Sequence, residues 1–207
     1  MKTSFLILVL SFMNVFTCNQ NQSETSKKQI EIKDRTQRNI LIVFLSRTKN
    51  TEAVAKIIQK KVGGNLVSLG LVNPYPENYQ KIVAQVDREN DEGFLPELKT
   101  KINDLDNNDT IFIGFPTWDM QMPPPKKSFL SENDLNGKTI IPFNTNAGYG
   151  VGSGFDTVEE LCSDSTILEG FSTKGGVERD GILFVMEGEK LIQVKKQVTF
   201  WLQKIGF

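Results

Sequence analysis

The sequence predicts an α/β fold for residues 39–207, in which a doubly wound, five-stranded parallel sheet carries helices on both faces. Short, continuous apolar runs recur along this region, and such runs are typical of strands that are covered on both faces. Helical patterns lie between them, and this alternation implies right-handed βαβ units. The composition supports one globular domain, since the 207 residues are 39% hydrophobic and carry a formal net charge of −1.

Five segments are expected to form the strands. Three of them are strongly apolar, namely 40–45 (ILIVFL), 110–115 (TIFIGF) and 138–144 (KTIIPFN). Pro142 has no N–H to offer a neighbouring strand, so we expect it near the end of its own strand. Residues 65–72 alternate less cleanly and are expected to form an outer strand. Residues 166–171 are the fifth candidate, with 181–185 (GILFV) as an extension.

Apolar residues at helical spacing predict the helices that connect these strands. They fall in the segments 54–62, 79–86, 98–105, 155–165 and 191–205. The fourth segment contains Cys162, which we interpret as a small buried hydrophobic residue and not as a reactive thiol. In a sheet of this kind, ligands bind beyond the carboxyl ends of the strands, where the strand order reverses. The site is therefore expected in the loops that follow the three strongly apolar strands.

The composition excludes several functional classes. The chain contains no histidine, which excludes Ser-His-Asp and Cys-His nucleophilic sites and histidine-ligated metals, and no metal site is expected. The near-neutral charge argues against binding through phosphate contacts, so no nucleic-acid partner is expected. No G-x-x-x-x-G-K-[ST] motif occurs, which excludes a nucleotide-triphosphate P-loop.

The N-terminal region is expected to direct export. Lys2 precedes the apolar stretch 4–16, which is shorter than the about 20 residues of a spanning helix and is typical of a signal-peptide h-region. Cys18 follows directly, so residues 1–18 are similar to the lipobox signal of bacterial lipoproteins, with Cys18 as the lipidated residue. The polar residues 19–38 predict a tether. The prediction is an exported lipoprotein of the periplasm or cell envelope, anchored to the membrane by its lipid; the alternative is an ordinary secretory signal.

The loop after the first strand is dense in hydrogen-bonding groups. Residues 46–51 (SRTKNT) place three hydroxyls, an amide and two cations at the start of a helix. Unpaired backbone N–H groups and the helix dipole favour an anion at such a position. Simple N-capping by Thr48, Asn50 or Thr51 is the alternative, but it needs only one residue of this kind. The density therefore favours a phosphate site.

Three loops, each after a predicted strand, resemble those of the flavodoxin family. Residues 42–55 (IVFLSRTKNTEAVA) resemble the family's first strand, phosphate loop and helix start, and 114–119 (GFPTWD) resemble its G-[YF]-P-x-W flavin loop. Residues 145–153 (TNAGYGVGS), preceded by GKTIIPF, resemble a glycine-rich loop of one branch of the family. The chain departs from the family at Lys49, where glycine is frequent, and at Asp119-Met120, where the related branch often has an aromatic residue and a glycine.

The resemblance implies a flavodoxin-like fold with one bound FMN. It assigns the phosphate to Ser46, Thr48, Asn50 and Thr51, with Arg47 adding charge and Lys49 in the same loop. Trp118 would lie against the isoalloxazine ring, and the backbone of Pro116, Thr117, Trp118 and Asp119 would meet its polar edge. The other side would be closed by Thr145, Asn146, Ala147, Gly148, Tyr149 and Gly150, with Tyr149 as a second aromatic wall.

Several functions follow from the resemblance. The chain would be an electron-transfer protein with a redox partner protein, or an FMN-dependent enzyme that passes electrons from NAD(P)H to a quinone, a nitro compound or another small-molecule electron acceptor. A flavin-binding module without redox turnover is a third interpretation. The run 148–154 (GYGVGSG) does not predict NAD binding, because it lacks a true G-x-G-x-x-G and follows a late strand.

Overall fold

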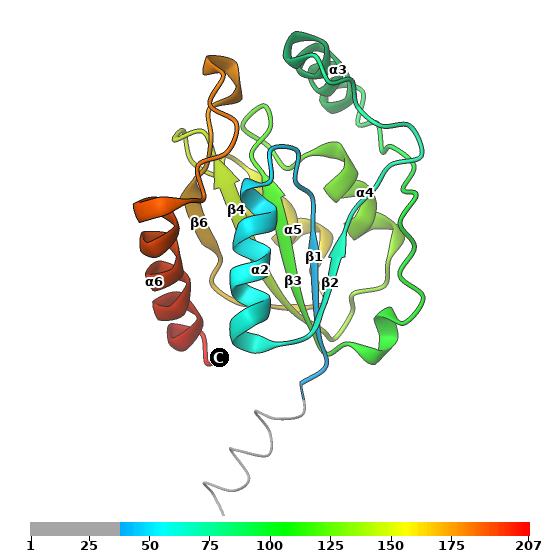
Figure 1. Ribbon diagram of the computed structural model, residues 1–207. Helices are drawn as coiled ribbons and strands as arrows, with labels where there is room; N and C mark the ends of the chain where they lie inside the picture. Colours follow the sequence, from blue (N-terminus) through cyan, green and yellow to red (C-terminus); the bar gives the residue numbers. More distant parts are fainter. Residues whose placement is uncertain (1–37) are drawn as a thin grey trace, which may run out of the picture. The chain divides into compact units, whose positions relative to one another are not determined.

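The computed structural model describes residues 38–207 (Figure 1). The predicted signal segment, Cys18 and the tether up to residue 37 lie outside the described residues. Within the described part of the chain, no helix is both long enough and apolar enough to cross a membrane. Arg38 begins the domain beside its C-terminus, because its guanidinium donates to the Gly206 carbonyl at 3.4 Å and lies 4.5 Å from the centre of the Phe207 ring.

A parallel sheet forms the centre of the domain (Figure 1). The strands that lie side by side are, in order, β2 (Asn65–Ser68), β1 (Ile40–Phe44), β3 (Thr110–Pro116), β4 (Thr139–Asn146) and β5 (Thr166–Ile167), and β6 (Phe171–Lys174) also pairs with β4. β5 and β6 pair with successive parts of β4 and together fill the fifth position. The predicted doubly wound sheet is confirmed, and the direction of chain progress reverses between β1 and β3.

Pro142 lies in the middle of β4, and the prediction that it would lie near a strand end is wrong. β5 ends at Ile167, opposite Ile140, and β6 begins at Phe171, opposite Phe143. The interruption between β5 and β6 therefore falls where β4 has no N–H to donate. A proline is tolerated inside this strand because the neighbouring strand is broken beside it.

Helices cover both faces of the sheet, as predicted. The even-numbered side chains of β1 pack in one apolar cluster with α2 (Asn50–Val62) and α6 (Gly188–Lys204). The odd-numbered side chains of β1 pack in a second cluster with α4 (Pro124–Glu132), which the sequence did not predict, and with α5 (Gly154–Leu161). Cys162, at the end of α5, is buried in this second cluster, and burial raises the pKa of its thiol to about 11. Both facts support its interpretation as a packing residue.

One helix does not cover the sheet. α3 (Tyr79–Asp91) lies beyond the carboxyl ends of the strands and contributes no residue to either apolar cluster (Figure 1). Its start is fixed by Asn78, whose side chain accepts a hydrogen bond from the Lys81 N–H at 3.0 Å. Ile82 and Val86 on this helix are nevertheless buried. The apolar side of α3 therefore packs over the carboxyl edge of the sheet, where the site is expected.

The helix predicted over residues 98–105 is wrong. Leu98 pairs with Leu71 in an isolated β-bridge, and a short 3₁₀ turn at Leu105–Asn107 is the only helical element in that segment. The chain is extended here because it runs beside the residues that follow β2, where the Gly70 N–H donates to the Thr100 hydroxyl at 2.8 Å. Its apolar residues pack against the sheet without forming a helix.

The strand extension predicted over residues 181–185 is also wrong. These residues belong to the loop 175–187 that connects β6 to α6, here called the post-β6 loop. Two backbone groups of residues 181–185 bond to the side chain of Asn50 and not to a strand: Asn50 Nδ2 donates to the Leu183 carbonyl at 2.6 Å, and Asn50 Oδ1 accepts from the Val185 N–H at 3.1 Å. Asn50 thereby fastens the post-β6 loop to the start of α2.

Candidate functional site

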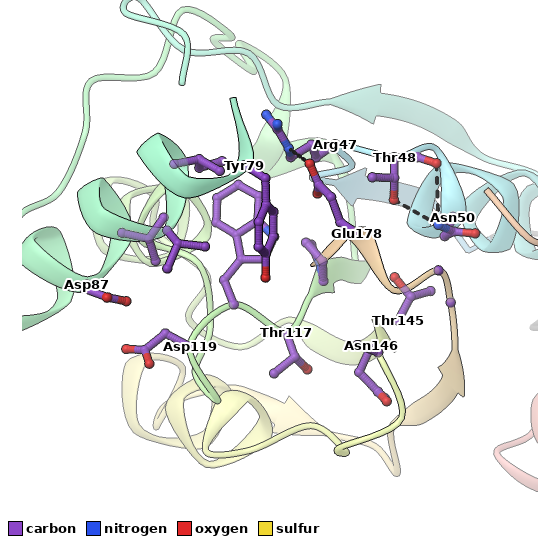
Figure 2. Close-up of a pocket in the computed structure, with 18 residues that line it drawn as sticks. Arg47, Thr48, Asn50, Tyr79, Asp87, Thr117, Asp119, Thr145, Asn146 and Glu178 are labelled. Carbon is purple, nitrogen blue, oxygen red and sulfur yellow. Dashed lines mark hydrogen bonds and ion pairs between the residues drawn. The ribbon is translucent and has the colours of Figure 1, made fainter. Parts of the chain in front are cut away.

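The loops after β1, β3 and β4 meet the post-β6 loop at the carboxyl edge of the sheet and enclose a cleft of about 290 Å³ (Figure 2). This is the position predicted from the strand order. The residues of the predicted site that line this cleft are Arg47, Thr48, Asn50, Pro116, Thr117, Trp118, Asp119, Thr145, Asn146 and Ala147.

The cleft has two chemically different ends. Figure 2 shows Thr48, Asn50 and Thr145 at one of them, which we call the loop end. Asp87 and Asp119 lie at the other (Figure 2), which we call the aromatic end because the half-buried Trp118 and the side chains of α3 form its walls.

Thr48 is the hydroxyl residue of the loop 46–51 that lines the cleft. Its Oγ1 accepts a hydrogen bond from Asn50 Nδ2 at 2.9 Å. A hydroxyl that accepts one hydrogen bond still has its own proton to donate. Thr48 can therefore donate to an anion at the start of α2, where the helix dipole also favours negative charge.

Three other residues predicted to hold a phosphate do not line this cleft. The hydroxyl of Ser46 accepts from the Glu52 N–H at 3.2 Å and so caps the first turn of α2. Thr51 is only 1% exposed, and its hydroxyl pairs with that of Thr145 at 2.8 Å. Lys49 is exposed and has a left-handed backbone with φ of 65°. The N-cap position of α2 is Lys49, which makes no side-chain cap hydrogen bond, so N-capping by Thr48, Asn50 or Thr51 is not observed. Thr48 lies where a phosphate ligand is expected.

Arg47 connects three parts of the cleft wall. Its Nε forms an ion pair with Glu178 of the post-β6 loop at 2.7 Å, and its guanidinium also donates to the carbonyl of Pro76 at 3.0 Å and to that of Glu77 at 2.5 Å. The last two residues lead into α3. Arg47 therefore holds α3 and the post-β6 loop together. The carboxylate of Glu178 offsets part of the positive charge that Arg47 was expected to offer to a phosphate.

The floor between the two ends is a network of short polar side chains. Buried Asn144 donates to the Phe115 carbonyl at 3.1 Å and to the Thr117 hydroxyl at 3.0 Å, and this hydroxyl donates to the Gly150 carbonyl at 2.9 Å. Asn146 Oδ1 accepts from the Gly148 N–H at 2.8 Å. These bonds fix the loops after β3 and β4 to each other before any ligand binds, which lowers the cost of ordering on binding.

A tight turn carries Trp118 into the aromatic end. Trp118 and Gln121 exchange backbone hydrogen bonds of 3.2 and 2.9 Å, and the two residues between them, Asp119 and Met120, have φ of 49° and 52°. Positive φ at both central positions is characteristic of a type I′ turn and costs about 1–3 kcal/mol for each residue other than glycine. Gly152 packs against this turn, since a Cβ there would lie 1.8 Å from the Met120 carbonyl oxygen.

α3 supplies a wall of the cleft that the sequence pattern did not predict. Tyr79, Ile82, Val83, Val86 and Asp87 line the cleft from this helix. The spacing of the first four predicted the helix correctly but was interpreted as a face that covers the sheet. Gly175, Gly176 and Glu178 of the post-β6 loop were also missed, although a Gly-Gly pair directly after a strand is a signal for close backbone approach.

A second cavity of about 170 Å³ shares residues with the cleft. Thr117 and Asn146 line both, and Tyr149 and Gly150 line the second one. Tyr149 is 65% exposed, and its hydroxyl accepts from Arg179 at 3.2 Å. Gly148 lines neither cavity. The two aromatic residues predicted to enclose the ring thus line different cavities, Trp118 the cleft and Tyr149 the second cavity.

The sequence profile of a protein family described as flavodoxin matches residues 39–187. This chain belongs to the flavodoxin family. Membership agrees with the strand order and with a cleft at the edge where that order reverses. A comparison with curated proteins gives no match.

Solved structures share the flavodoxin-like fold. A candidate flavoprotein from Bacteroides eggerthii is 24% identical and has a TM-score of 0.66, with 83% of this chain and 99% of that chain covered. A candidate flavoprotein from Bacteroides uniformis is 22% identical, with a TM-score of 0.63 and coverage of 78% and 98%. A flavoprotein from Lactobacillus acidophilus, solved in complex with FMN, is 20% identical, with a TM-score of 0.58 and coverage of 70% and 99%.

FMN is the cofactor that membership in the flavodoxin family implies, and the residues of the cleft fit it. The Thr48 hydroxyl and the start of α2 suit a phosphate at the loop end. Trp118 and the apolar side chains of α3 suit a planar ring at the aromatic end. The cleft and the second cavity together have the volume of a ligand site, for which roughly 300–1,000 Å³ is usual.

Proposed function

We propose that this flavodoxin-like protein binds FMN in the cleft and transfers electrons through it. The observation that carries the proposal is that one cleft joins an anion-binding helix start, beside Thr48, to an aromatic wall at Trp118. The Lactobacillus acidophilus structure, solved in complex with FMN, supports the choice of cofactor.

The residues of the cleft have distinct roles in this proposal. Thr48 and the backbone N–H groups at the start of α2 bind the phosphate, and Trp118 stacks on the ring. The apolar residues Ile82, Val83 and Val86 of α3 exclude water from the ring. When bound, FMN supplies the redox chemistry, whereas the protein binds it, orients it and sets its environment.

Analysis of the cofactor tests this proposal. Mass spectrometry of the small molecules released by heating should find FMN, and FAD or no flavin after reconstitution would overturn the assignment. Anaerobic chemical reduction and reoxidation, followed by visible absorption, should be reversible. A flavin that binds tightly but cannot be cycled would contradict electron transfer and favour the binding module without redox turnover.

The second cavity favours one alternative, an FMN-dependent NAD(P)H oxidoreductase. It adjoins the cleft and is lined by Tyr79, Met120, Tyr149 and Arg179, which would give a small second substrate aromatic walls and a cation. Anaerobic addition of NADH or NADPH to the FMN-loaded protein separates the two functions. Rapid bleaching of the flavin favours the enzyme and a small-molecule acceptor, whereas an unchanged spectrum favours a carrier with a protein partner.

We also propose that the domain is exported and held at a membrane through Cys18. The support is the sequence: the apolar stretch 4–16 is followed by a cysteine and a polar segment. Two or three acyl chains should anchor the domain firmly, whereas one gives only marginal binding. Cys18→Ser should move the protein out of the membrane fraction and abolish incorporation of labelled fatty acid. A processed variant that still sediments with membranes would contradict lipidation.

A further inference from the structure

The indole of Trp118 has an aromatic neighbour that lies outside the group of residues lining the cleft. Tyr75, in the segment that leads to α3, packs against it edge to face, with ring centroids 5.4 Å apart and an interplanar angle of 89°. This is a preferred geometry for an aromatic pair and favours one orientation of the indole over others. Tyr75 is therefore placed to determine how Trp118 faces the cleft.

Tyr75 is itself fixed by a buried carboxylate. Its phenol donates a hydrogen bond to Glu89 Oε2, and Gln85 Nε2 donates to Glu89 Oε1 at 2.7 Å. Glu89 is only 5% exposed, so it is one of the few charged side chains that the domain buries. Burial of Tyr75, together with its hydrogen bond to Glu89 and the charge of that carboxylate, raises the pKa of the phenol above its usual value. The phenol consequently remains protonated and remains the donor.

Asn90, the residue of α3 after Glu89, contacts the turn 118–121 that carries Trp118. Asn90 Nδ2 donates to Asp119 Oδ2 at 3.2 Å, and Lys127 of α4 donates to Asn90 Oδ1 at 3.2 Å. Gln121 Nε2 also donates to Asp119 Oδ2, at 3.3 Å. A turn with two left-handed residues that are not glycine persists only when its surroundings hold it. The end of α3 thus bonds to the Asp119 side chain of this turn through Asn90, and reaches the indole that the turn carries through Glu89 and Tyr75.

We propose that Tyr75 and Glu89 are positioning residues, which hold the Trp118 indole in the orientation that a flavin ring stacks on. This inference rests on the proposed function, because it concerns the wall against which the ring lies. Neither residue touches the cofactor in this proposal; both act through Trp118. The competing explanation is that the Tyr75–Glu89 bond only ties the segment before α3 to that helix.

The first test observes Trp118 directly in the full chain without flavin. The protein has two tryptophans, Trp118 and Trp201, so labelling with 5-fluorotryptophan gives two ¹⁹F NMR signals, and Trp118→Phe identifies one of them. Tyr75→Phe and Glu89→Ala should shift or broaden the Trp118 signal and leave the Trp201 signal unchanged. Glu89→Gln, which keeps a hydrogen-bond acceptor, should restore the wild-type spectrum.

Asp91→Ala provides the matched control, because Asp91 is an exposed acidic residue at the end of the same helix. It should leave both signals unchanged. An unmoved Trp118 signal in Tyr75→Phe and Glu89→Ala would overturn the inference. Equal movement of both tryptophan signals would also overturn it, because that result indicates general loss of structure.

The second test measures the consequence for FMN. Tyr75→Phe and Glu89→Ala should weaken FMN about 2- to 10-fold, the range that corresponds to one aromatic pair, and should change its midpoint potential. Glu89→Gln should return both quantities close to wild type. If the wild-type chain binds no FMN, the proposed function fails while the ¹⁹F spectra still decide the positioning of Trp118. If FMN binds and neither its affinity nor its midpoint potential changes in Tyr75→Phe and Glu89→Ala, the positioning inference fails and the proposed function stands.

Discussion

At the loop end of the cleft, the side chains nearest the start of α2 come from one short run of sequence, residues 46–51, whereas the aromatic end is assembled from parts far apart in the chain. Trp118 comes from the turn after β3, its neighbour Tyr75 from the segment before α3, and the opposing apolar residues from α3 itself. The candidate phosphate ligands of the loop end therefore come from local sequence, although Thr145 of β4 lies beside them, whereas the aromatic end depends on tertiary packing throughout.

The two ends also use their polar groups differently. At the loop end, most hydrogen-bonding side chains bind other parts of the protein: Thr51 pairs with Thr145, Arg47 with Glu178, and Asn50 with the post-β6 loop. At the aromatic end, the polar groups of Glu89 and Asn90 support a wall without lining it. The dense cluster of donors in the sequence thus predicts the position of the cleft, but it does not show which of the donors face it.

Removing the aromatic wall should have the largest effect. Trp118→Ala deletes the surface on which we propose that the ring stacks, so FMN affinity should fall by about 3 kcal/mol, or roughly 100-fold. Riboflavin has the same ring and should lose a similar factor. Fluorescence titration of both ligands measures this.

A suitable control for this variant is Phe200→Ala, which truncates an aromatic residue that is 71% exposed on α6, outside the cleft. It should bind both ligands like the wild type. If Trp118→Ala also left both affinities unchanged, the aromatic end would not hold the ring.

A variant at the loop end, in contrast, should distinguish FMN from riboflavin. Thr48→Val keeps the shape of the side chain but deletes its hydroxyl, so FMN should lose about 1.5–2 kcal/mol, more than tenfold in affinity. Riboflavin, which lacks the phosphate, should bind as before. Thr157→Val, which removes a hydroxyl from α5 outside the cleft, serves as the control. Equal losses for FMN and riboflavin would mean that Thr48 shapes the loop and does not bind the phosphate.

Thr51 should behave differently from Thr48, although both stand in the same loop. Because the Thr51 hydroxyl is buried against that of Thr145, Thr51→Val should lower the free energy of unfolding by about 1 kcal/mol and leave FMN affinity unchanged. Urea denaturation measures the first quantity. In the double variant Thr51→Val/Thr145→Val the two losses should not add, since neither hydroxyl is left unpaired. Full additivity would contradict the pairing.

The sequence predicted the sheet well because its strands are short apolar runs that need no tertiary information. The errors lie where a contact between distant segments overrides a local pattern. Pro142 occupies the middle of β4 because the neighbouring strand is broken beside it. Leu98 follows a helical pattern but pairs with the extended chain at Leu71. In both places, the residues that determine the local structure lie more than twenty positions away in the sequence, so a local pattern cannot predict it.

The candidate site was predictable to the same extent. The loops of the cleft were found because each follows a strong strand at the edge where ligands bind. The α3 wall was not, since Ile82 and Val86 show the same spacing whether a helix covers a sheet or closes a cleft. The pair of Tyr75 and Glu89 gives no signal in the sequence, because a buried carboxylate and its phenol partner are recognisable only once the chain has folded.

The smallest expected effect concerns this pair at alkaline pH. The pKa of Tyr75 is raised in the folded protein, first by burial and then by the hydrogen bond to Glu89 and the charge of that residue. Above its unfolded value of 10.0 the phenol loses its proton in the unfolded chain but keeps it in the folded one. The folded state then binds more protons, so its stability must fall as pH rises. Below pH 10 this contribution is fully present.

Tyr75→Phe removes the titrating group, so the free energy of unfolding should decline less steeply between about pH 10 and pH 11 in this variant than in the wild type. Glu89→Gln removes the charge but leaves the burial, and its slope should lie between those of the other two. Urea denaturation at closely spaced pH values measures all three slopes. Equal slopes for Tyr75→Phe and the wild type would mean that folding does not raise the pKa of Tyr75, and would contradict the burial of its phenol against Glu89.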